Sequence, residues 1–348
     1  MDNIEWWRHQ LCRRKFLAGA VAIASGAGLV SCNRPLAQTP TSQNHNKKRA
    51  VIALVLGVQN ESFYITMQKG AQQRANELGI SLISDAPAQF DPALQTVIVE
   101  AMIARRVDAI LIAACDKDVM IKPLKHAYDA GIKIISVDTS IGNGDYIHGP
   151  VTFPLSYIGS DNVEGGRIAG SALIKAIGGK GKVYVQSVKP TLSTVVQRAQ
   201  GFRDAIEATE GAVTMVKMDY NDDSSMLATE QTANVLHQVK GLSGIFGVNM
   251  PSALGAAQAV KATNQEGVIQ VVAIDAPDYA VADIRNGVVD IAIAQLPGEM
   301  GRIGVEYAIK ALSGQTSSLK KRVVTNYFII DKNNVDTSEA QAVIYKSK

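Results

Sequence analysis

Hydrophobic and polar positions alternate between two patterns along most of the chain. Short and nearly continuous apolar runs recur, as expected of parallel strands that are buried on both faces. These runs cover 51–58, 80–84, 109–114, 133–138, 182–187, 244–249 and 268–275. Between them lie segments with apolar residues at helical spacing, at 65–78, 92–105, 163–177, 193–209, 224–239 and 252–262. A regular alternation of strand and helix predicts an α/β fold with right-handed crossovers.

Two arrangements fit this alternation: a single eight-fold barrel, or two doubly wound parallel sheets. The irregular segment 142–161, "GNGDYIHGPVTFPLSYIGSD", favours two sheets, because it separates four strand–helix units from a fresh series. A further helix at 298–312 is followed by the strand-rich stretch "RVVTNYFII", which suits a chain that crosses back between two lobes. Ligands of such open sheets bind beyond the carboxyl ends of the strands.

The first residues carry signals for export. "CRRKFLA" at 12–18 resembles a twin-arginine motif, and the apolar segment 16–30 follows it. That segment is shorter than the about 20 apolar residues that span a membrane. "LVSC" then matches the lipobox of bacterial lipoproteins, in which Cys32 would take the lipid. We predict a signal peptide over 1–31 and a periplasmic or cell-surface protein that is lipid-anchored to a membrane; an uncleaved N-terminal anchor is the alternative.

The next residues are predicted to form a tether, at 32–49. "NRPLAQTPTSQNHNKK" has almost no apolar content, as a disordered linker requires. Of the cysteines, Cys12 would leave with the signal peptide and Cys32 would be acylated, which leaves only Cys115 as a free thiol. No disulfide is then possible within one mature chain.

Composition and charge exclude several classes of function. The 348 residues are 47% apolar and 19% charged, which is ordinary for a chain with two soluble domains. The formal net charge is +3 and the basic residues are scattered, so no nucleic-acid partner is predicted. The histidines and Cys115 show neither zinc spacing nor an activated nucleophile, so we predict no metal site, no cofactor and no catalytic residue. The glycines of "GSDNVEGGRIAG" fall in a predicted helix, where they would allow close packing against a sheet.

Aromatic, carboxylate and amide side chains follow the predicted strands in both halves of the chain. They are Glu61, Phe63, Tyr64, Cys115, Asp116, Asp138, Thr139, Asn249, Asp275 and Gln295. Aromatic rings pack on the apolar face of a sugar, while charged planar groups bind adjacent hydroxyls, so this set suits a polyhydroxylated ligand. The alternative for each residue is that it caps the following helix, above all for Asp275 before Ala276 and Pro277.

Several stretches, in order, resemble the type I periplasmic sugar-binding proteins of ABC importers, the ribose-binding-protein family. They include "VIALVLGVQNESFYITMQKGAQQRANELG", "YIGSDNVEGGRIAG", "QRAQGFRDAI", "GIFGVNMPSALGAAQAV", "VVAIDAP" and "IAQLPGEMG". The resemblance implies two Rossmann-like lobes, joined by three crossover strands, that close around one monosaccharide. It implies an N-terminal lobe of 50–158 plus 296–324 and a C-terminal lobe of 159–295 plus 325–348.

The resemblance also implies roles for particular residues. Phe63 and Tyr64 match the family's stacking pair, and Asp138 matches a carboxylate that accepts from two sugar hydroxyls. The family's ligand arginine and the polar groups of the second lobe correspond to Arg198, Asn249, Asp275 and Gln295.

The sequence departs from the ribose-binding pattern mainly in the first lobe. Glu61 stands where the ribose binders have asparagine, Ala113 replaces a second asparagine, and Thr139 replaces an arginine. In the second lobe Met250 stands where aspartate is common, and only Tyr220 offers a stacking aromatic. The ligand could therefore be ribose or another pentose, a hexose, a ketose such as fructose, or a polyol.

These observations predict a non-enzymatic, membrane-tethered receptor, which we expect to be a monomer. It would capture a monosaccharide and deliver it to the transmembrane subunits of an ABC permease. One alternative is a receptor of the same fold for a signal molecule, polyol or nucleoside. A more remote alternative is an exported α/β-barrel enzyme that acts on sugars.

Overall fold

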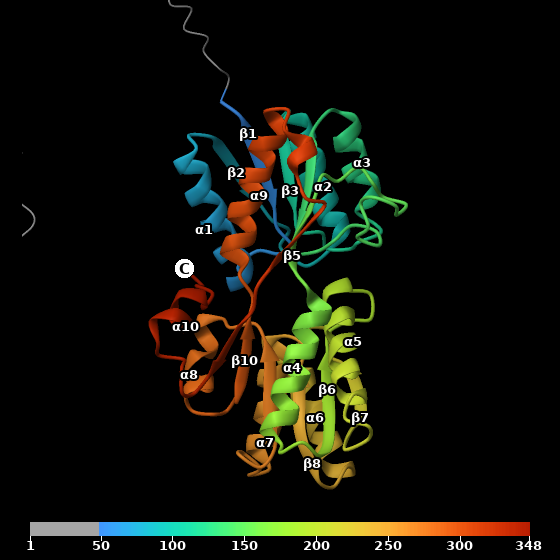
Figure 1. The fold of residues 1–348 in the computed structure, drawn as a ribbon, viewed down its shortest axis with the longest axis vertical. Coiled ribbons are helices and arrows are strands. Elements are labelled where there is room, and N and C mark those ends of the chain that lie inside the picture. Colours follow the sequence, from blue (N-terminus) through green and yellow to red (C-terminus); the bar gives the residue numbers. More distant parts are fainter. Residues whose placement is uncertain (1–48) are drawn as a thin grey trace, which may run out of the picture. The chain divides into compact units, whose positions relative to one another are not determined.

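The computed structural model describes residues 49–348, which form two α/β lobes, each built on a six-stranded sheet (Figure 1). The prediction of two doubly wound lobes is confirmed, and the single eight-fold barrel is wrong, because the strands form two separate sheets. The predicted signal peptide, Cys32 and nearly all of the predicted tether lie outside the described residues.

The sheet of the first lobe is parallel throughout, in the order β11-β5-β4-β3-β1-β2. Its strands are β1 (Val51–Val55), β2 (Ser81–Asp85), β3 (Ala109–Ile112), β4 (Lys133–Val137), β5 (Tyr157–Ser160) and β11 (Arg322–Thr325). Its helices are α1 (Ser62–Glu77), α2 (Pro92–Ala104), α3 (Ile121–Asp129) and α9 (Pro297–Leu312), with the short η2 (Thr316–Ser318) after α9. Helices α1 and α9 form one apolar cluster with the sheet, and α2 and α3 form another.

The sheet of the second lobe has the order β12-β10-β9-β8-β6-β7, in which only β12 is antiparallel to its neighbour. Its strands are β6 (Gly181–Ser187), β7 (Val213–Tyr220), β8 (Leu242–Gly247), β9 (Gln270–Ile274), β10 (Ile291–Ala294) and β12 (Phe328–Asp331). Its helices are α4 (Asn162–Ala176), α5 (Ser193–Glu207), α6 (Ser225–Gln238), α7 (Met250–Ala262), η1 (Asp278–Ala280), α8 (Val281–Arg285) and α10 (Ser338–Val343). The first five strands of each lobe along the chain therefore have the same spatial order, β5-β4-β3-β1-β2 in the first lobe and β10-β9-β8-β6-β7 in the second.

The chain passes between the lobes at three places, which Figure 1 shows near the label β5. It leaves β5 for α4 through Asp161, returns from β10 to α9 through Gln295 and Leu296, and leaves β11 for β12 through Asn326 and Tyr327. Tyr327 Oη donates to the carbonyl oxygen of Asp161 at 3.0 Å. The first and third crossovers are thereby bonded to each other.

Glycines set the distance between α4 and α5. A Cβ on Gly166 would lie 1.9 Å from the carbonyl oxygen of Arg198, and one on Gly201 would lie 1.8 Å from that of Val163. Such distances are too short for any side chain, so the two helices can meet only because these positions are glycine. The glycines Gly166 and Gly170 of "GSDNVEGGRIAG" thus pack against α5, whereas the sequence predicts packing against a sheet. The contact fixes the helix that carries Arg198.

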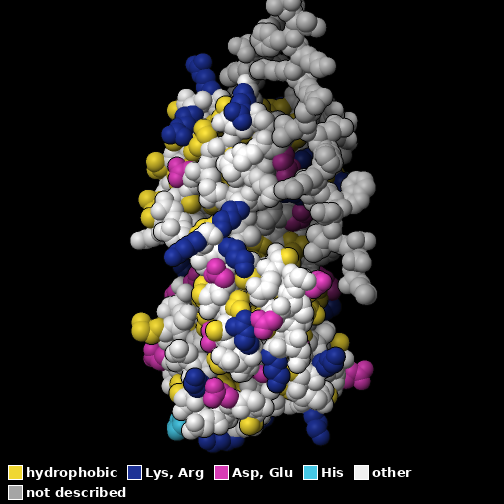
Figure 2. Space-filling view, turned by 90° about the vertical axis from the view of Figure 1, so that its left-hand side faces the viewer, with side chains coloured by type: hydrophobic (Ala, Val, Ile, Leu, Met, Phe, Trp, Pro, Cys, Tyr) yellow, Lys and Arg dark blue, Asp and Glu magenta, His cyan; other side chains and the backbone are white. Residues whose placement is uncertain are grey.

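The surface carries charges of both signs. Lys and Arg side chains are interspersed with Asp and Glu on the face drawn in Figure 2, with some gathering of basic groups at mid-height. This mixture agrees with the formal net charge of +3. Among residues 49–348, no helix combines the length and the apolar character needed to cross a bilayer.

Candidate functional site

Two carboxylates occupy equivalent positions in the two lobes. Asp138 follows β4 and Asp275 follows β9, and each of these is the fourth strand of its lobe along the chain. The backbone N–H of Asp138 donates to Ile158 O, and that of Asp275 donates to Ile293 O, both at 2.9 Å. Each residue has a positive φ, 61° and 82°, a conformation that costs a non-glycine residue about 1–3 kcal/mol but that aspartate tolerates better than most. The fold thus turns one carboxylate away from each sheet at the edge where ligands bind.

Asp138 is buried, but only one of its two carboxylate oxygens accepts hydrogen bonds from the described part of the protein. Its Oδ2 accepts from Tyr64 Oη at 3.3 Å and from Thr139 Oγ1 at 3.1 Å. Within residues 49–348, no hydrogen bond of the protein reaches Oδ1. Burial raises the pKa of Asp138 to about 6, although Arg198 of the other lobe acts in the opposite direction.

Arg198 is the cation of this site. It is buried on α5, where its Nε donates to Asn162 Oδ1 at 2.9 Å and its Nη1 donates to Val248 O at 3.0 Å. Nη1 also lies 3.6 Å from Asp275 Oδ2. Burial alone would lower the pKa of Arg198, but neighbouring acidic groups, led by Asp275, raise it on balance. The guanidinium therefore remains charged. It forms an ion pair with Asp275 of the second lobe and interacts electrostatically with Asp138 of the first.

Gln295 lies at the second crossover and belongs to the same network. Its Nε2 donates to Asp275 Oδ1 at 2.7 Å, and its backbone N–H donates to Tyr345 Oη at 2.6 Å. Its Oε1 is buried and has no partner within the described residues. A buried acceptor without a donor is rare, and this oxygen retains the capacity to accept a hydrogen bond.

Glu61 and Asn249 are helix caps as well as predicted ligand residues. Glu61 Oε2 accepts from the backbone N–H groups of Phe63 at 2.8 Å and Tyr64 at 3.3 Å, which begins α1. Asn249 Oδ1 accepts from Ser252 N at 3.2 Å, while its Nδ2 donates to a carboxylate of the β7–α6 loop at 2.7 Å. The capping alternative therefore applies to these two residues. It does not apply to Asp275, since the next helical turn begins only at Asp278.

Glu61 faces the second lobe. Burial is the main reason that its pKa rises to about 7, and the charge of Asp275 across the cleft is the next. The first lobe thus brings an acidic group opposite an acidic group of the second. Both causes favour the protonated form of Glu61 over the carboxylate in this structure.

Phe63 and Tyr64 are neighbours at the start of α1, and both are buried. Their ring centroids lie 5.3 Å apart with the planes at 88°, so one ring meets the other edge-on. Tyr64 also holds Asp138 through its hydroxyl group. In the second lobe, Tyr220 lies at the end of the edge strand β7 with 39% of its surface exposed.

Cys115 is also close to the strand ends, yet its thiol is bonded and buried. Sγ donates to Gly57 O at 3.1 Å, and burial raises the pKa of the thiol to about 12. Because the thiolate is the nucleophilic form, this cysteine is inert at neutral pH.

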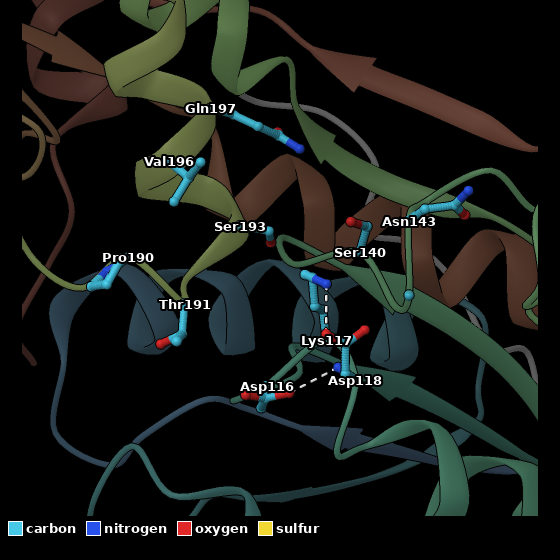
Figure 3. Close-up of a pocket in the computed structure, with 11 residues that line it drawn as sticks. Asp116, Lys117, Asp118, Ser140, Asn143, Pro190, Thr191, Ser193, Val196 and Gln197 are labelled. Carbon is cyan, nitrogen blue, oxygen red and sulfur yellow. Dashed lines mark hydrogen bonds and ion pairs between the residues drawn. The ribbon is translucent and has the colours of Figure 1, made fainter.

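A cavity of about 340 Å³ is lined by residues from both lobes (Figure 3). The first lobe contributes the loops after β3 and β4, and the second contributes the start of α5. Its polar lining is Asp116, Lys117, Asp118, Ser140, Asn143, Thr191, Ser193 and Gln197. Ser140 lies two residues after Asp138, and Gln197 directly precedes Arg198. None of the ligand residues predicted from the sequence is among the residues that line this cavity.

Two residues that bond to the predicted ligand residues, Tyr345 and Asp223, are not predicted from the sequence. Tyr345 bonds to Gln295 and Asp275 from a segment far along the chain that shows no strand or helix pattern. Asp223 accepts from Asn249 at 2.7 Å and follows a strand that the apolar pattern did not reveal. For Asp223 a usable signal existed in "DYNDDSS", whereas nothing local marks Tyr345.

Comparison with known proteins places this geometry in a family. Residues 52–316 match the family model described as periplasmic binding protein domain. The ribose import binding protein of Salmonella typhimurium is 32% identical over 270 residues, which are 77% of this chain and 87% of the relative.

Solved structures show the same likeness. An ABC transporter solute-binding protein from Agrobacterium vitis, bound with α-D-tagatopyranose, is 43% identical with a TM-score of 0.81; the match covers 85% of this chain and 99% of that one. A second protein from Agrobacterium vitis, with bound D-fucose, is 28% identical with a TM-score of 0.77 and covers 85% of this chain and 100% of its own.

The chain belongs to the periplasmic binding protein family, in its type I form with two α/β lobes.

Proposed function

We propose that this protein is the substrate-binding receptor of an ABC importer, which captures a monosaccharide between its lobes and delivers it to the permease. The observation that carries this conclusion is the pair of equivalent carboxylates, Asp138 and Asp275, with Arg198 beside them. Each lobe supplies part of one polar site, so a small polyhydroxylated ligand gains its full set of bonds only when the lobes close. Relatives named for ribose import and for tagatose binding support the same role.

We propose a ketohexose in its pyranose form as the ligand. The relative with bound α-D-tagatopyranose is 43% identical, whereas the ribose import protein cited above is 32% identical. The first-lobe side of the site also departs from the ribose pattern at Glu61 and Thr139. An acidic cap in place of an amide replaces an NH₂ donor by a carboxyl group, which donates only when it is protonated, so the hydroxyl pattern that the site recognises changes.

The ligand-binding set that we propose includes residues of both lobes. It consists of Glu61, Phe63, Tyr64, Asp138, Arg198, Asn249, Asp275 and Gln295. Its test is isothermal titration calorimetry with purified protein and a panel of tagatose, fructose, ribose, allose, a polyol and a nucleoside. We expect one-to-one binding that is tightest for a ketohexose. Preference for the nucleoside or the polyol would favour a receptor of another kind.

We propose that the protein is not an enzyme, because the site has polar binding groups but no activated nucleophile. The family consists of solute-binding proteins of transport systems, which supports this view. Chromatography of each panel sugar after prolonged incubation should return the sugar unchanged. Conversion of any sugar, proportional to protein concentration, would contradict the receptor function.

We propose a lipid anchor at Cys32, preceded by a signal peptide at 1–31 and followed by a tether to residue 49, with a monomeric receptor reaching the permease from the membrane surface. The support is the "LVSC" sequence and the polar tract after it. Expression of the full chain in a bacterium with labelled palmitate should label the wild type and leave Cys32→Ser unlabelled and soluble. Equal labelling of the two would contradict the anchor.

A further inference from the structure

Residues 344–348 form a strap that is bonded to the second lobe. The backbone N–H of Tyr345 donates to Ala276 O at 3.0 Å, and that of Asp278 donates to Tyr345 O at 2.9 Å. These bonds form a parallel bridge between Tyr345 and Pro277. The backbone N–H of Ser347 adds a bond to Asp278 Oδ2 at 2.8 Å.

The same strap is bonded to the first lobe. The backbone N–H of Lys346 donates to Thr66 Oγ1 on α1 at 3.0 Å. The Lys69 ammonium, one turn further along α1, donates to the carbonyl oxygen of Lys348. Alternate residues of the strap therefore contact opposite lobes, in addition to the three covalent crossovers.

The side chain of Tyr345 also spans the two lobes. Its ring is fully buried in the apolar cluster of the first lobe and meets the ring of Phe63 at 5.6 Å and 79°. Its hydroxyl group reaches the second lobe, where it accepts from Gln295 N at 2.6 Å and lies 3.3 Å from Asp275 Oδ1. One tyrosine thus joins the stacking pair of one lobe to the carboxylate of the other.

We propose that Tyr345 is a positioning residue of the sugar site and that the strap couples ligand binding to closure of the lobes. The proposal rests on the proposed function, since it assigns Tyr345 to the same site. The hydroxyl group fixes the rotamer of Asp275 and satisfies the backbone of Gln295, so both side chains meet the ligand already oriented. Because the ring is anchored against Phe63, this orientation is available only when the first lobe lies against the second.

A simpler role for Tyr345 is that it fills a hole in the core. Phenylalanine would then serve as well, apart from the loss of stability that follows when a buried N–H loses its acceptor. Tyr146 allows this loss to be measured separately. It is also buried, and its hydroxyl group accepts from a backbone N–H, that of Ile141, at 2.8 Å and bonds to Ser136 Oγ at 2.7 Å. Tyr146→Phe is therefore the matched control.

The first test compares Tyr345→Phe, Tyr146→Phe and wild type by calorimetry with the panel sugar that wild type binds best, and by thermal unfolding. We expect both variants to lose similar thermal stability. Only Tyr345→Phe should lose affinity, by about tenfold to a hundredfold, because Asp275 and Gln295 must then be oriented at the expense of the binding free energy. Affinity within about threefold of wild type for Tyr345→Phe would overturn the proposal.

The second test needs no variant. Hydrogen–deuterium exchange of wild type, followed by mass spectrometry of peptides that contain residues 344–348, should show slower exchange when sugar is added. Unchanged exchange of the strap in a sample that binds sugar would overturn the coupling. If wild type binds no sugar of the panel, the proposed function fails and this inference fails with it; sugar binding with an unaffected Tyr345→Phe overturns this inference alone.

Discussion

The substitution Asp138→Asn isolates the charge of one carboxylate that we propose to bind the ligand. Asparagine has nearly the same shape as aspartate and, like it, adopts positive φ more readily than other non-glycine residues, so the φ of 61° is retained. Alanine would add backbone strain to the lost interaction. The amide oxygen can still accept from Tyr64 and Thr139, while an NH₂ group replaces Oδ1.

The size of the effect follows from the bonds that Oδ1 would make. A hydrogen bond to a charged group contributes about 1.5–3 kcal/mol, and the buried position of Asp138 provides little water to replace it. Losing one such bond, and weakening another, reduces the binding free energy by about 2–4 kcal/mol, or about 30-fold to 1,000-fold in the dissociation constant.

Stability should move in the opposite direction. Because the folded-state pKa of Asp138 is raised to about 6, the carboxylate destabilises the folded protein progressively as the pH rises from its ordinary value, about 3.9, to 6. Asparagine removes that penalty. At pH 7.5 we therefore expect the unfolding temperature of Asp138→Asn to equal or exceed that of wild type.

Calorimetry and scanning fluorimetry at pH 7.5 measure the two quantities on the same sample. Asp129→Asn is the control, since Asp129 lies exposed on α3, where it is paired with Lys125. It should leave affinity unchanged. An Asp138→Asn variant that binds within about threefold of wild type would refute the placement of Asp138 against the ligand.

Three further predictions concern a titrating group, a packing contact and a thiol. Sugar affinity of wild type should fall as the pH rises through about 7, because closure of the lobes favours protonated Glu61. Calorimetry of Glu61→Gln across that pH range should find a constant affinity. A remaining pH dependence in the variant would assign the titration to another group. Gly166→Ala should lower the unfolding free energy by about 1–3 kcal/mol in urea titrations, since its Cβ would meet Arg198 O at 1.9 Å. The control is Ser171→Ala at an exposed position of the same helix, which should change the unfolding free energy little. Cys115 should react with a thiol reagent at pH 8 only after denaturation, because its pKa is about 12; rapid labelling of the native protein would contradict its burial.

Local pattern was sufficient for most of the fold. Continuous apolar runs mark strands that are covered on both faces, and the described structure has a strand at each of the predicted runs. β7 was missed because it is an edge strand in which only Val213 is buried and charged residues interrupt the apolar ones, so its sequence shows no continuous run. Position after a strand also identified Asp138 and Asp275, since parallel strands all present their carboxyl ends at one edge.

The sequence by itself therefore determined the succession of strands and helices, the two-lobed class of fold and the polar groups that end each strand. Only the tertiary structure decided which of those groups meet. It pairs Arg198 with Asp275, and it inserts Tyr345 between Phe63 of the first lobe and Asp275 of the second. These contacts join residues 70 or more positions apart, as with Asp275 and Tyr345, and no periodicity connects such positions. They depend on how two rigid lobes face each other, which is a property of the packed chain rather than of any segment.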